Sequence, residues 1–263
     1  MVAYDGGGYR GFAEQAGVPT VAGALALAVS RAARLEEPPK IVCAGRTDAG
    51  VHAEGQVVHV DLPAGYDGDL LRAVNRQTAP AVVVRAAGPA PEGFDARRSA
   101  RWRHYRYLVH EGPVPDPLLA GLAWHVADPL DLRSMAAAAD PLTGEHDFRA
   151  FCRRPPGTSP EVPIVRRVLW AGWRELAGDG SGMPPSPHGR ALGAAACGRL
   201  LRFDIVAGSY CHKMVRSVVA TLVEAGRGRA NAATVVAMLA AGSRAGAPQP
   251  APPHGLCLVE VGY

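Results

Sequence analysis

The order of apolar and polar residues along the chain predicts a mixed α/β protein. Apolar residues recur at helical spacing around 20–34, 69–77, 131–139, 210–226 and 231–241. Alternating or short apolar runs predict strands at 2–4, 41–44, 56–62, 81–86, 103–110, 164–174, 200–206 and 256–262. Because strands and helices alternate in two comparable halves, we expect an α+β fold with helices on one face of a large sheet.

The two expected halves meet near residue 100. The first half, 1–100, and the second half, 101–263, each carry their own strands and helices. A Gly- and Pro-rich stretch at about 177–198 has no apolar period, so we expect a surface loop inserted between two strands of the second half.

The composition indicates a globular enzyme of the cytoplasm. The 263 residues are 48% hydrophobic and 20% charged, and no apolar run approaches the roughly 20 residues that a membrane-spanning helix needs. We expect no signal peptide, because the chain opens on a short strand and a glycine loop rather than on a charged and then apolar segment. The five cysteines are scattered and never form a CxxC pair, so we expect reduced, mostly buried thiols rather than a disulfide framework or a zinc site.

Positive charge is concentrated in one aromatic segment. The net charge is only +4, but the stretch DARRSARWRHYRYLVH, residues 95–110, holds five arginines interleaved with Trp, His and Tyr. Guanidinium groups pair with phosphate and aromatic rings stack on bases, which favours binding of single-stranded or splayed-out RNA. A solvated strand edge with cation–π pairs explains the same pattern equally well.

A second unusual segment is CAGRTDAGVHAEGQVVHVDL, residues 43–62. Polar residues stand between glycines just before an alternating strand, and Asp48 has Arg46 two residues before it and His52 four residues after it. A carboxylate near arginine stays ionised, which suits a nucleophile or an electrostatic stabiliser. An Asx-turn that holds the loop through its backbone is the structural alternative.

The third segment is SYCHKMVRSVVATLVEAG, residues 209–226. Its spacing predicts a helix with His212, Lys213 and Arg216 in the first turns. The helix dipole disfavours cations at that end, so their charge needs a partner, either a phosphate or a buried carboxylate. Structural pairing alone is a further alternative. Cys211 beside His212 could be half of a metal site or a nucleophile, but no second pair has ligand spacing.

These segments together resemble the tRNA pseudouridine synthase A family. The stretch 43–62 is similar to the family signature nearly residue for residue. Further similar segments follow in the family's order over most of the chain: AYDGGGYRGF, TVAGALALAVSRA, SARWRHYRYLV, GEHDFRAF, YCHKMVRSVVATLVEAGRG and HGLCLVEVGY. The resemblance implies the pseudouridine synthase fold, in which two similar α/β halves form one large, mostly antiparallel sheet with a central active-site cleft.

The resemblance also implies roles for individual residues. Asp48 matches the catalytic aspartate, Tyr105 the tyrosine that stacks on the target uracil, and Arg216 the arginine that pairs with the aspartate. Arg46 matches the residue that helps to displace the target nucleotide. We assign substrate binding to Arg46, Thr47, His52, Gln56, Arg103, His104, His212, Lys213 and Leu258. The chemistry requires no cofactor and no metal.

The expected function is isomerisation of uridine to pseudouridine in RNA, with the tRNA anticodon stem-loop as substrate and a homodimer as the acting form. The chain departs from the usual family pattern at Phe12–Ala13, at Ala22 and over 76–81. Two alternatives therefore stay open. One is a divergent paralogue that makes pseudouridine from another RNA, or from a nucleotide for a C-nucleoside pathway. The other is an RNA-binding protein without catalysis.

Overall fold

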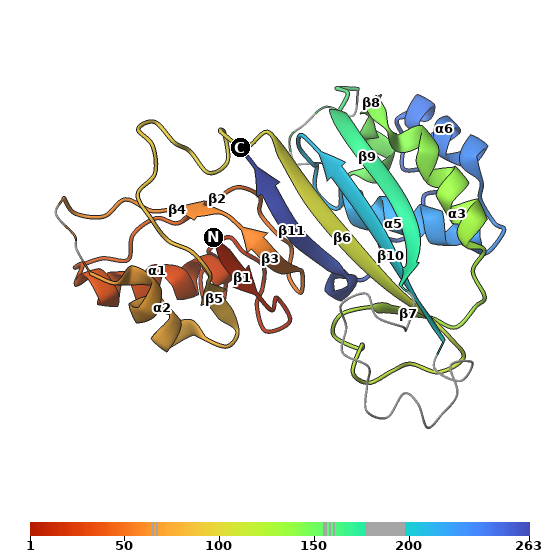
Figure 1. Cartoon of the computed structure of the whole chain (residues 1–263). Coiled ribbons are helices and arrows are strands. Elements are labelled where there is room, and N and C mark those ends of the chain that lie inside the picture. Colours follow the sequence, from red (N-terminus) through yellow and green to blue (C-terminus); the bar gives the residue numbers. More distant parts are fainter. Residues whose placement is uncertain (65, 67, 155–156, 158, 160, 177–197) are drawn as a thin grey trace. The chain divides into compact units, whose positions relative to one another are not determined.

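The computed structural model describes residues 1–64, 66, 68–154, 157, 159, 161–176 and 198–263 (Figure 1). The chain divides into two compact units: Met1–His104 joined by Cys257–Tyr263, and Tyr105–Leu256. The last strand thus groups with the first unit, whereas the sequence analysis had placed it in the second half. The predicted insert at 177–198 lies outside the described residues, apart from Gly198.

The first unit combines two helices with a short mixed sheet. Its elements are β1 (Val2–Tyr4), α1 (Val21–Ala33), β2 (Val42–Cys43), β3 (His52–Gln56), β4 (Val58–His59), α2 (Leu70–Thr78), β5 (Val82–Val84) and β11 (Leu256–Gly262). The strand order is β5-β1-β3-β11. Strand β1 is antiparallel to both β5 and β3, whereas β11 runs parallel to β3. Strands β2 and β4 form a separate antiparallel pair.

Helix α1 is set by its ends and by one apolar face. The Thr20 hydroxyl accepts a hydrogen bond from the Gly23 N–H at 3.2 Å, and Arg34 ends the helix in the left-handed conformation. The buried residues of the helix are Val21, Ala22, Leu25, Ala26, Ala28 and Val29, and α1 packs against α2.

Glycine is required where β3 meets β11. A Cβ atom on Gly55 would lie 2.3 Å from the carbonyl oxygen of Val259. No other residue fits this distance without moving backbone, so Gly55 allows β11, from the end of the chain, to lie against β3.

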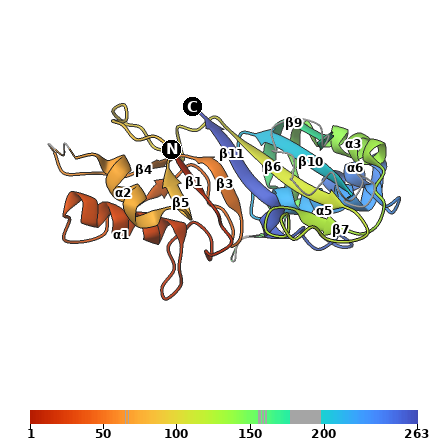
Figure 2. The ribbon, with the colours of Figure 1, turned by 60° about the horizontal axis from the view of Figure 1, so that its bottom comes forward.

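The second unit is a sheet covered by helices (Figures 1 and 2). Its elements are β6 (Trp102–Glu111), β7 (Trp124–Val126), α3 (Leu132–Ala139), the 3-10 turn η1 (Asp140–Leu142), β8 (Gly144–Asp147), the 3-10 turn η2 (Phe148–Phe151), β9 (Val165–Leu176), β10 (Arg199–Ala207), α5 (Met214–Gly226), α6 (Ala232–Ala241) and the 3-10 turn η3 (Pro253–Gly255). The strand order is β6-β10-β9-β8, with β7 parallel to β6. Strand β9 is antiparallel to β8 and β10.

The core of the second unit lies between this sheet and its helices. Helix α3 packs on α5, α6 and β9. Large side chains that are fully buried here include Met135, Phe148, Phe151, Leu201, Phe203, Ile205 and Leu222. On β10 the buried residues Leu201, Phe203 and Ile205 alternate as a strand with one core face requires.

Two element boundaries differ from the sequence prediction. The strand expected at 56–62 is instead β3, which ends at Gln56, followed by the short β4. The chain turns away here because Ala44 N–H donates to the Val57 carbonyl at 2.9 Å, next to the β2–β4 pair. Helix α5 begins at Met214 rather than near 210, because Lys213 has a φ of 65°. His212 and Lys213 therefore precede the helix.

The fold class predicted from the sequence is confirmed: the protein is mixed α/β, with a large, mostly antiparallel sheet and helices. In the described part of the chain, no helix combines the length and apolar character needed to cross a membrane.

The cysteines only partly match the expectation of reduced thiols. Cys43 and Cys257 are buried thiols outside any disulfide, and burial raises the pKa of the Cys43 thiol to about 11, while Cys197 lies outside the described residues. Cys152 and Cys211 are instead joined by a disulfide, with their Cα atoms 5.8 Å apart. They are separated by 59 residues, so no local spacing signalled the pair.

Candidate active site

The Asp48 loop, residues 45–51, connects β2 to β3 in the first unit. Val51 N–H donates to the Asp48 carbonyl at 3.1 Å and closes a tight turn around Gly50, whose φ is 78°. Asp48 is half-buried and Arg46 is exposed. The turn therefore leaves the carboxylate at the surface of the unit, on backbone that is fixed from both sides.

Gln56 fixes the start of the loop. Its side chain is fully buried at the end of β3 and donates to the Gly45 carbonyl at 2.6 Å, while its oxygen accepts from the Gly45 N–H at 3.4 Å. The same amide nitrogen donates to the Tyr4 hydroxyl at 3.3 Å. One side chain thus holds both backbone groups of the residue where the loop begins.

Thr47 fixes the middle of the loop. Its hydroxyl lies 2.8 Å from the Tyr4 hydroxyl, and its carbonyl accepts from the Phe12 N–H at 3.0 Å. Burial raises the pKa of Tyr4 above its ordinary value, so this hydroxyl stays protonated and available as a donor. Gly11 has a φ of 101°, and its missing side chain allows the opening loop to reach Thr47.

Arg103 also holds the backbone next to the loop. Its guanidinium is buried and donates to the carbonyls of Ala44, Ala100 and Arg97, at 2.7 to 3.2 Å. The sequence analysis assigned this residue to substrate binding. In the structure, its planar fork joins the chain before β6 to the residue that precedes Gly45.

His52 links the Asp48 loop to the opening loop of the chain. Its Nδ1 lies 3.2 Å from the Gly6 N–H, which can donate to it, and 3.1 Å from the Asp5 carboxylate. A Cβ atom on Gly6 would lie 2.0 Å from the Val51 carbonyl oxygen, so the two loops touch through bare backbone. The proposed substrate contact of His52 stays a prediction.

Tyr105 lies in the second unit, on β6. Buried and less buried positions alternate along this strand, which places Tyr105 with Tyr107 and Val109 and opposite His104 and Arg106. The Tyr105 ring packs edge-to-face on Tyr210, with 4.9 Å between ring centres and 80° between planes. Contact with Tyr210 therefore fixes the orientation of the ring.

Arg216 is held at the start of α5 in the second unit. Its Nε donates to the Ala251 carbonyl at 2.7 Å, and Ala251 N–H donates back to the Arg216 carbonyl at 3.0 Å. The side chain is half-buried. This reciprocal pair fixes the chain before β11 against the helix and sets the direction of the guanidinium.

The remaining predicted substrate contacts lie in different surroundings. His212 is exposed and Lys213 half-buried, just before α5. Leu258 is fully buried on β11, paired with Ala53. Asp48 belongs to the first unit, and Tyr105 and Arg216 belong to the second. The roles of these residues in catalysis or binding stay predictions.

Sequence reasoning missed several positioning groups. Tyr4 and Phe12 hold Thr47, Tyr210 supports Tyr105, and Ala251 holds Arg216. Of these groups, the Tyr210 ring alone carries a signal in the sequence, because an aromatic ring beside a candidate motif often packs on it. A backbone carbonyl such as that of Ala251 carries none.

Comparison with known proteins identifies the family. The family model described as tRNA pseudouridine synthase matches residues 138–263. Over the full length of this chain, the tRNA pseudouridine synthase A of Frankia casuarinae is 40% identical, with 87% of that protein covered. Those of Cutibacterium acnes and Caulobacter vibrioides are both 38% identical over the full chain, with 87% and 97% of each protein covered. Matches of this length place the chain in the class of pseudouridine synthases. The chain belongs to the tRNA pseudouridine synthase A family.

Replacing Gln56 by leucine is expected to loosen the Asp48 loop. Gln56→Leu leaves both backbone groups of Gly45 without their partner, so the free energy of unfolding should fall by about 3 kcal/mol. The catalytic rate should fall by about tenfold or more, because a displaced reacting group loses its orientation. Thermal melts and initial rates measure the two effects. Gln15→Leu, at an exposed position, is the control; equal melts for the two variants would contradict this role.

Arg103→Lys separates a structural role from an RNA contact. Lysine keeps the charge but cannot reach three carbonyls at once, so the variant should melt roughly 5 °C lower. A pure phosphate contact would tolerate lysine with no change in stability. Arg101→Lys, at the exposed neighbouring position, is the control. An unchanged melting temperature for Arg103→Lys would contradict the structural role and favour a contact between Arg103 and the RNA.

Proposed function

We propose that the protein isomerises uridine to pseudouridine in tRNA, in the anticodon stem-loop. The observation that supports this most directly is the Asp48 loop, in which Gln56 and Thr47 fix the backbone on both sides of a half-buried carboxylate. Such a loop holds a charged group in place before substrate arrives. The relatives named tRNA pseudouridine synthase A support tRNA as the substrate.

The reaction breaks one bond to the sugar and forms another. The N1–C1′ bond of uridine is cleaved, the uracil turns, and C5 becomes bonded to C1′. The hydrogen at C5 is lost as a proton, and N1 gains one, so the product is an isomer of the substrate. The reaction has no net oxidation or reduction, and it consumes no water.

In this proposal the Asp48 carboxylate acts at C1′. It either attacks this carbon or stabilises the positive charge that develops there as the N1–C1′ bond breaks. Arg216, whose direction Ala251 sets, pairs with Asp48 and keeps it ionised. Tyr105, whose ring Tyr210 orients, stacks on the detached uracil and moves the proton.

The target base must leave its stack before it can react. Enzymes that act on a base inside a folded nucleic acid extrude it and hold it against aromatic side chains. Arg46 next to Asp48 and the arginines 97, 98 and 101 are exposed, so they are available to contact phosphates. We propose that Arg46 helps to displace the target nucleotide.

Release of tritium from C5 tests the activity. C5 loses its hydrogen as a proton when it becomes bonded to C1′. A tRNA labelled with tritium at C5 of uridine should therefore release label into water only where pseudouridine forms. Chromatography of the digested nucleosides then identifies the product and its position. Release from another RNA but not from tRNA would favour the divergent paralogue. Tight RNA binding without release would favour the non-catalytic binding protein.

We also propose that the protein acts as a homodimer in the cytoplasm. Leu169 and Trp170 on β9 are 47% and 52% exposed, which supplies apolar surface that a partner copy can cover. The tRNA substrate supports the cytoplasmic location. Sedimentation at two protein concentrations tests the dimer, and a species of monomer mass at both would reject it.

A further inference from the structure

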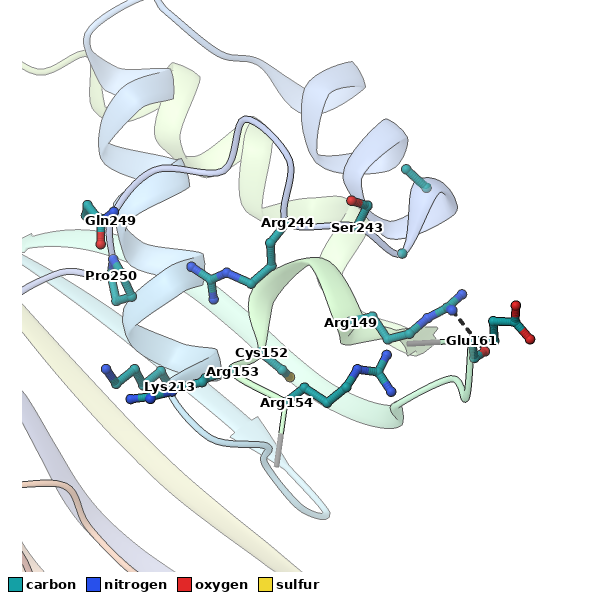
Figure 3. A pocket seen from close by; sticks show the side chains of 12 residues that line it. Arg149, Cys152, Arg153, Arg154, Glu161, Lys213, Ser243, Arg244, Gln249 and Pro250 are labelled. Atoms are coloured by element: carbon teal, nitrogen blue, oxygen red, sulfur yellow. Dashed lines mark hydrogen bonds between the residues drawn. The ribbon is translucent and has the colours of Figure 1, made fainter. Parts of the chain in front are cut away.

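The second unit contains an open basic pocket that the proposed chemistry does not use (Figure 3). Its volume is about 760 Å³. It lies between the segment after η2, the residues that precede α5 and the segment after α6. Among the lining residues that the structure describes, five are basic: Arg149, Arg153, Arg154, Lys213 and Arg244.

Two of the five cations shape the walls of the pocket. Arg149 forms an ion pair with Asp147 at 2.5 Å and donates to the Glu161 carbonyl at 3.0 Å. Arg154 donates to the carbonyls of Ser159 and Val162. These bonds tie Arg149 and Arg154 to described residues that follow η2, so part of the charge is used to build the site.

The other three cations are the candidates for binding a ligand. Within the described residues, no carboxylate lies at ion-pair distance from Arg153, Lys213 or Arg244. Among the described residues, the Arg244 guanidinium donates to the Ser217 hydroxyl, at 3.2 Å. Among the described lining residues, Glu161 is the one that is acidic, and its carboxylate lies at the edge of the pocket away from Lys213 and Arg153 (Figure 3).

The start of α5 adds to this excess of positive charge. Lys213 is the N-cap residue of α5, and no side chain caps this end. The first turn holds no acidic residue. The helix dipole places partial positive charge at the same end of α5. Cationic side chains here are repelled by this charge unless an anion is bound between them. Lys213 also has a φ of 65°, which is uncommon for a residue with a side chain and often marks a functional site.

The pocket is tied to the predicted catalytic arginine. Cys152, in the pocket wall, is bonded to Cys211, and Arg153 N–H donates to the His212 carbonyl at 2.9 Å. The wall is therefore attached to the chain just before α5. Arg216 comes three residues after Lys213, which is about 4.5 Å along a helix axis. Its partner Ala251 directly follows Pro250, another lining residue.

We propose that this pocket binds the phosphodiester backbone of the substrate RNA beside the target uridine, an inference that rests on the proposed function. Three cations on separate segments surround an open volume, which suits consecutive phosphates rather than one small anion. Among the described lining residues none is aromatic, so the pocket offers nothing on which a base can stack. The pocket therefore contacts the phosphates of the RNA backbone, and it positions the RNA without selecting its sequence.

The test compares two double variants of equal charge. Arg153→Gln/Arg244→Gln removes two pocket cations, and Arg133→Gln/Arg174→Gln removes two exposed arginines elsewhere in the second unit. Each pair is introduced into the Asp48→Asn protein, and the Kd for tRNA is measured over a series of salt concentrations. Binding measured in this way does not depend on turnover. The Kd values can therefore reject the pocket proposal while tritium release by the wild-type protein supports the proposed function. They can also support the pocket proposal when no tritium is released.

For the pocket variant, the slope of log K against log salt should become less steep by about 1.4–1.8, and Kd at moderate salt should rise by about tenfold. The surface variant should change neither quantity by a comparable amount. Arg153→Lys/Arg244→Lys keeps both charges and should retain the slope, which gives a second comparison if the glutamine variant does not fold.

Three outcomes would overturn the inference. The first is equal slopes for the pocket and surface variants. The second is a lysine variant that folds and loses as much affinity as the glutamine variant. The third uses inorganic pyrophosphate as a probe of small anions. If the glutamine variant loses pyrophosphate binding and keeps both its tRNA affinity and its slope, the pocket binds a small anion and not RNA.

Discussion

Asp48→Asn is expected to abolish pseudouridine formation, with a loss of at least about 10⁴-fold, while fold and tRNA affinity persist. Asparagine has the shape of aspartate but no charge, so it can neither attack C1′ nor stabilise positive charge there. The bonds that hold the loop come from Gln56, Thr47 and the backbone, and they do not require the carboxylate of residue 48. Tritium release measures the rate of pseudouridine formation. Thermal melts measure the stability of the fold, and filter binding measures the affinity for tRNA.

Two further variants make this test sharper. Asp48→Glu keeps the charge but moves it by one methylene. Its rate of pseudouridine formation should fall by about 100-fold or more, because the loop cannot shift to compensate. Asp61→Asn changes an exposed carboxylate of the same unit and should leave the rate unaltered. Tritium release by Asp48→Asn at a measurable fraction of the wild-type rate would remove Asp48 from the chemistry.

Arg216→Ala is expected to give an inactive and less stable protein, and Arg216→Lys an impaired one. Alanine loses the charge-assisted bond to the Ala251 carbonyl, which should lower the free energy of unfolding by about 1.5–3 kcal/mol. Lysine keeps the charge but lacks the planar fork that grips a carboxylate through two hydrogen bonds. Catalysis should therefore fall in the order arginine, lysine, alanine.

Melts and kinetics at saturating tRNA distinguish this role from a simple phosphate contact. A phosphate contact would raise KM and the salt dependence, and it would leave the melting temperature and kcat unchanged. Arg227→Ala is the control for kcat: Arg227 is the C-cap residue of α5 and pairs with Asp128 and Glu224, so its loss should lower the melting temperature and leave kcat unchanged. A normal kcat and an unshifted melt for Arg216→Ala would show that Arg216 does not pair with Asp48.

The sequence by itself determined the family and most of the elements, although it predicted neither β7 nor β8. Strand β6 lies within one residue of the predicted 103–110 at both ends, because alternation of side chains between two faces is a property of the strand itself. The amphipathic stretch ending at Gly226 predicted the body of α5 for the same reason. The order of motifs around Asp48, Tyr105 and Arg216 indicated the family, and the full-length matches confirmed it.

The tertiary structure alone decided what each polar side chain contacts. The sequence analysis assigned Arg103 to substrate binding, which stays a prediction, but it gave no sign that the guanidinium donates to the carbonyl of Ala44, 59 residues away. Cys152 and Cys211 meet across the same separation, and the basic pocket gathers residues from three segments of the chain. Periodicity records which face of an element is buried, because neighbours in the chain share that element. A hydrogen bond between distant residues depends on how the elements pack, and no local pattern encodes its partner.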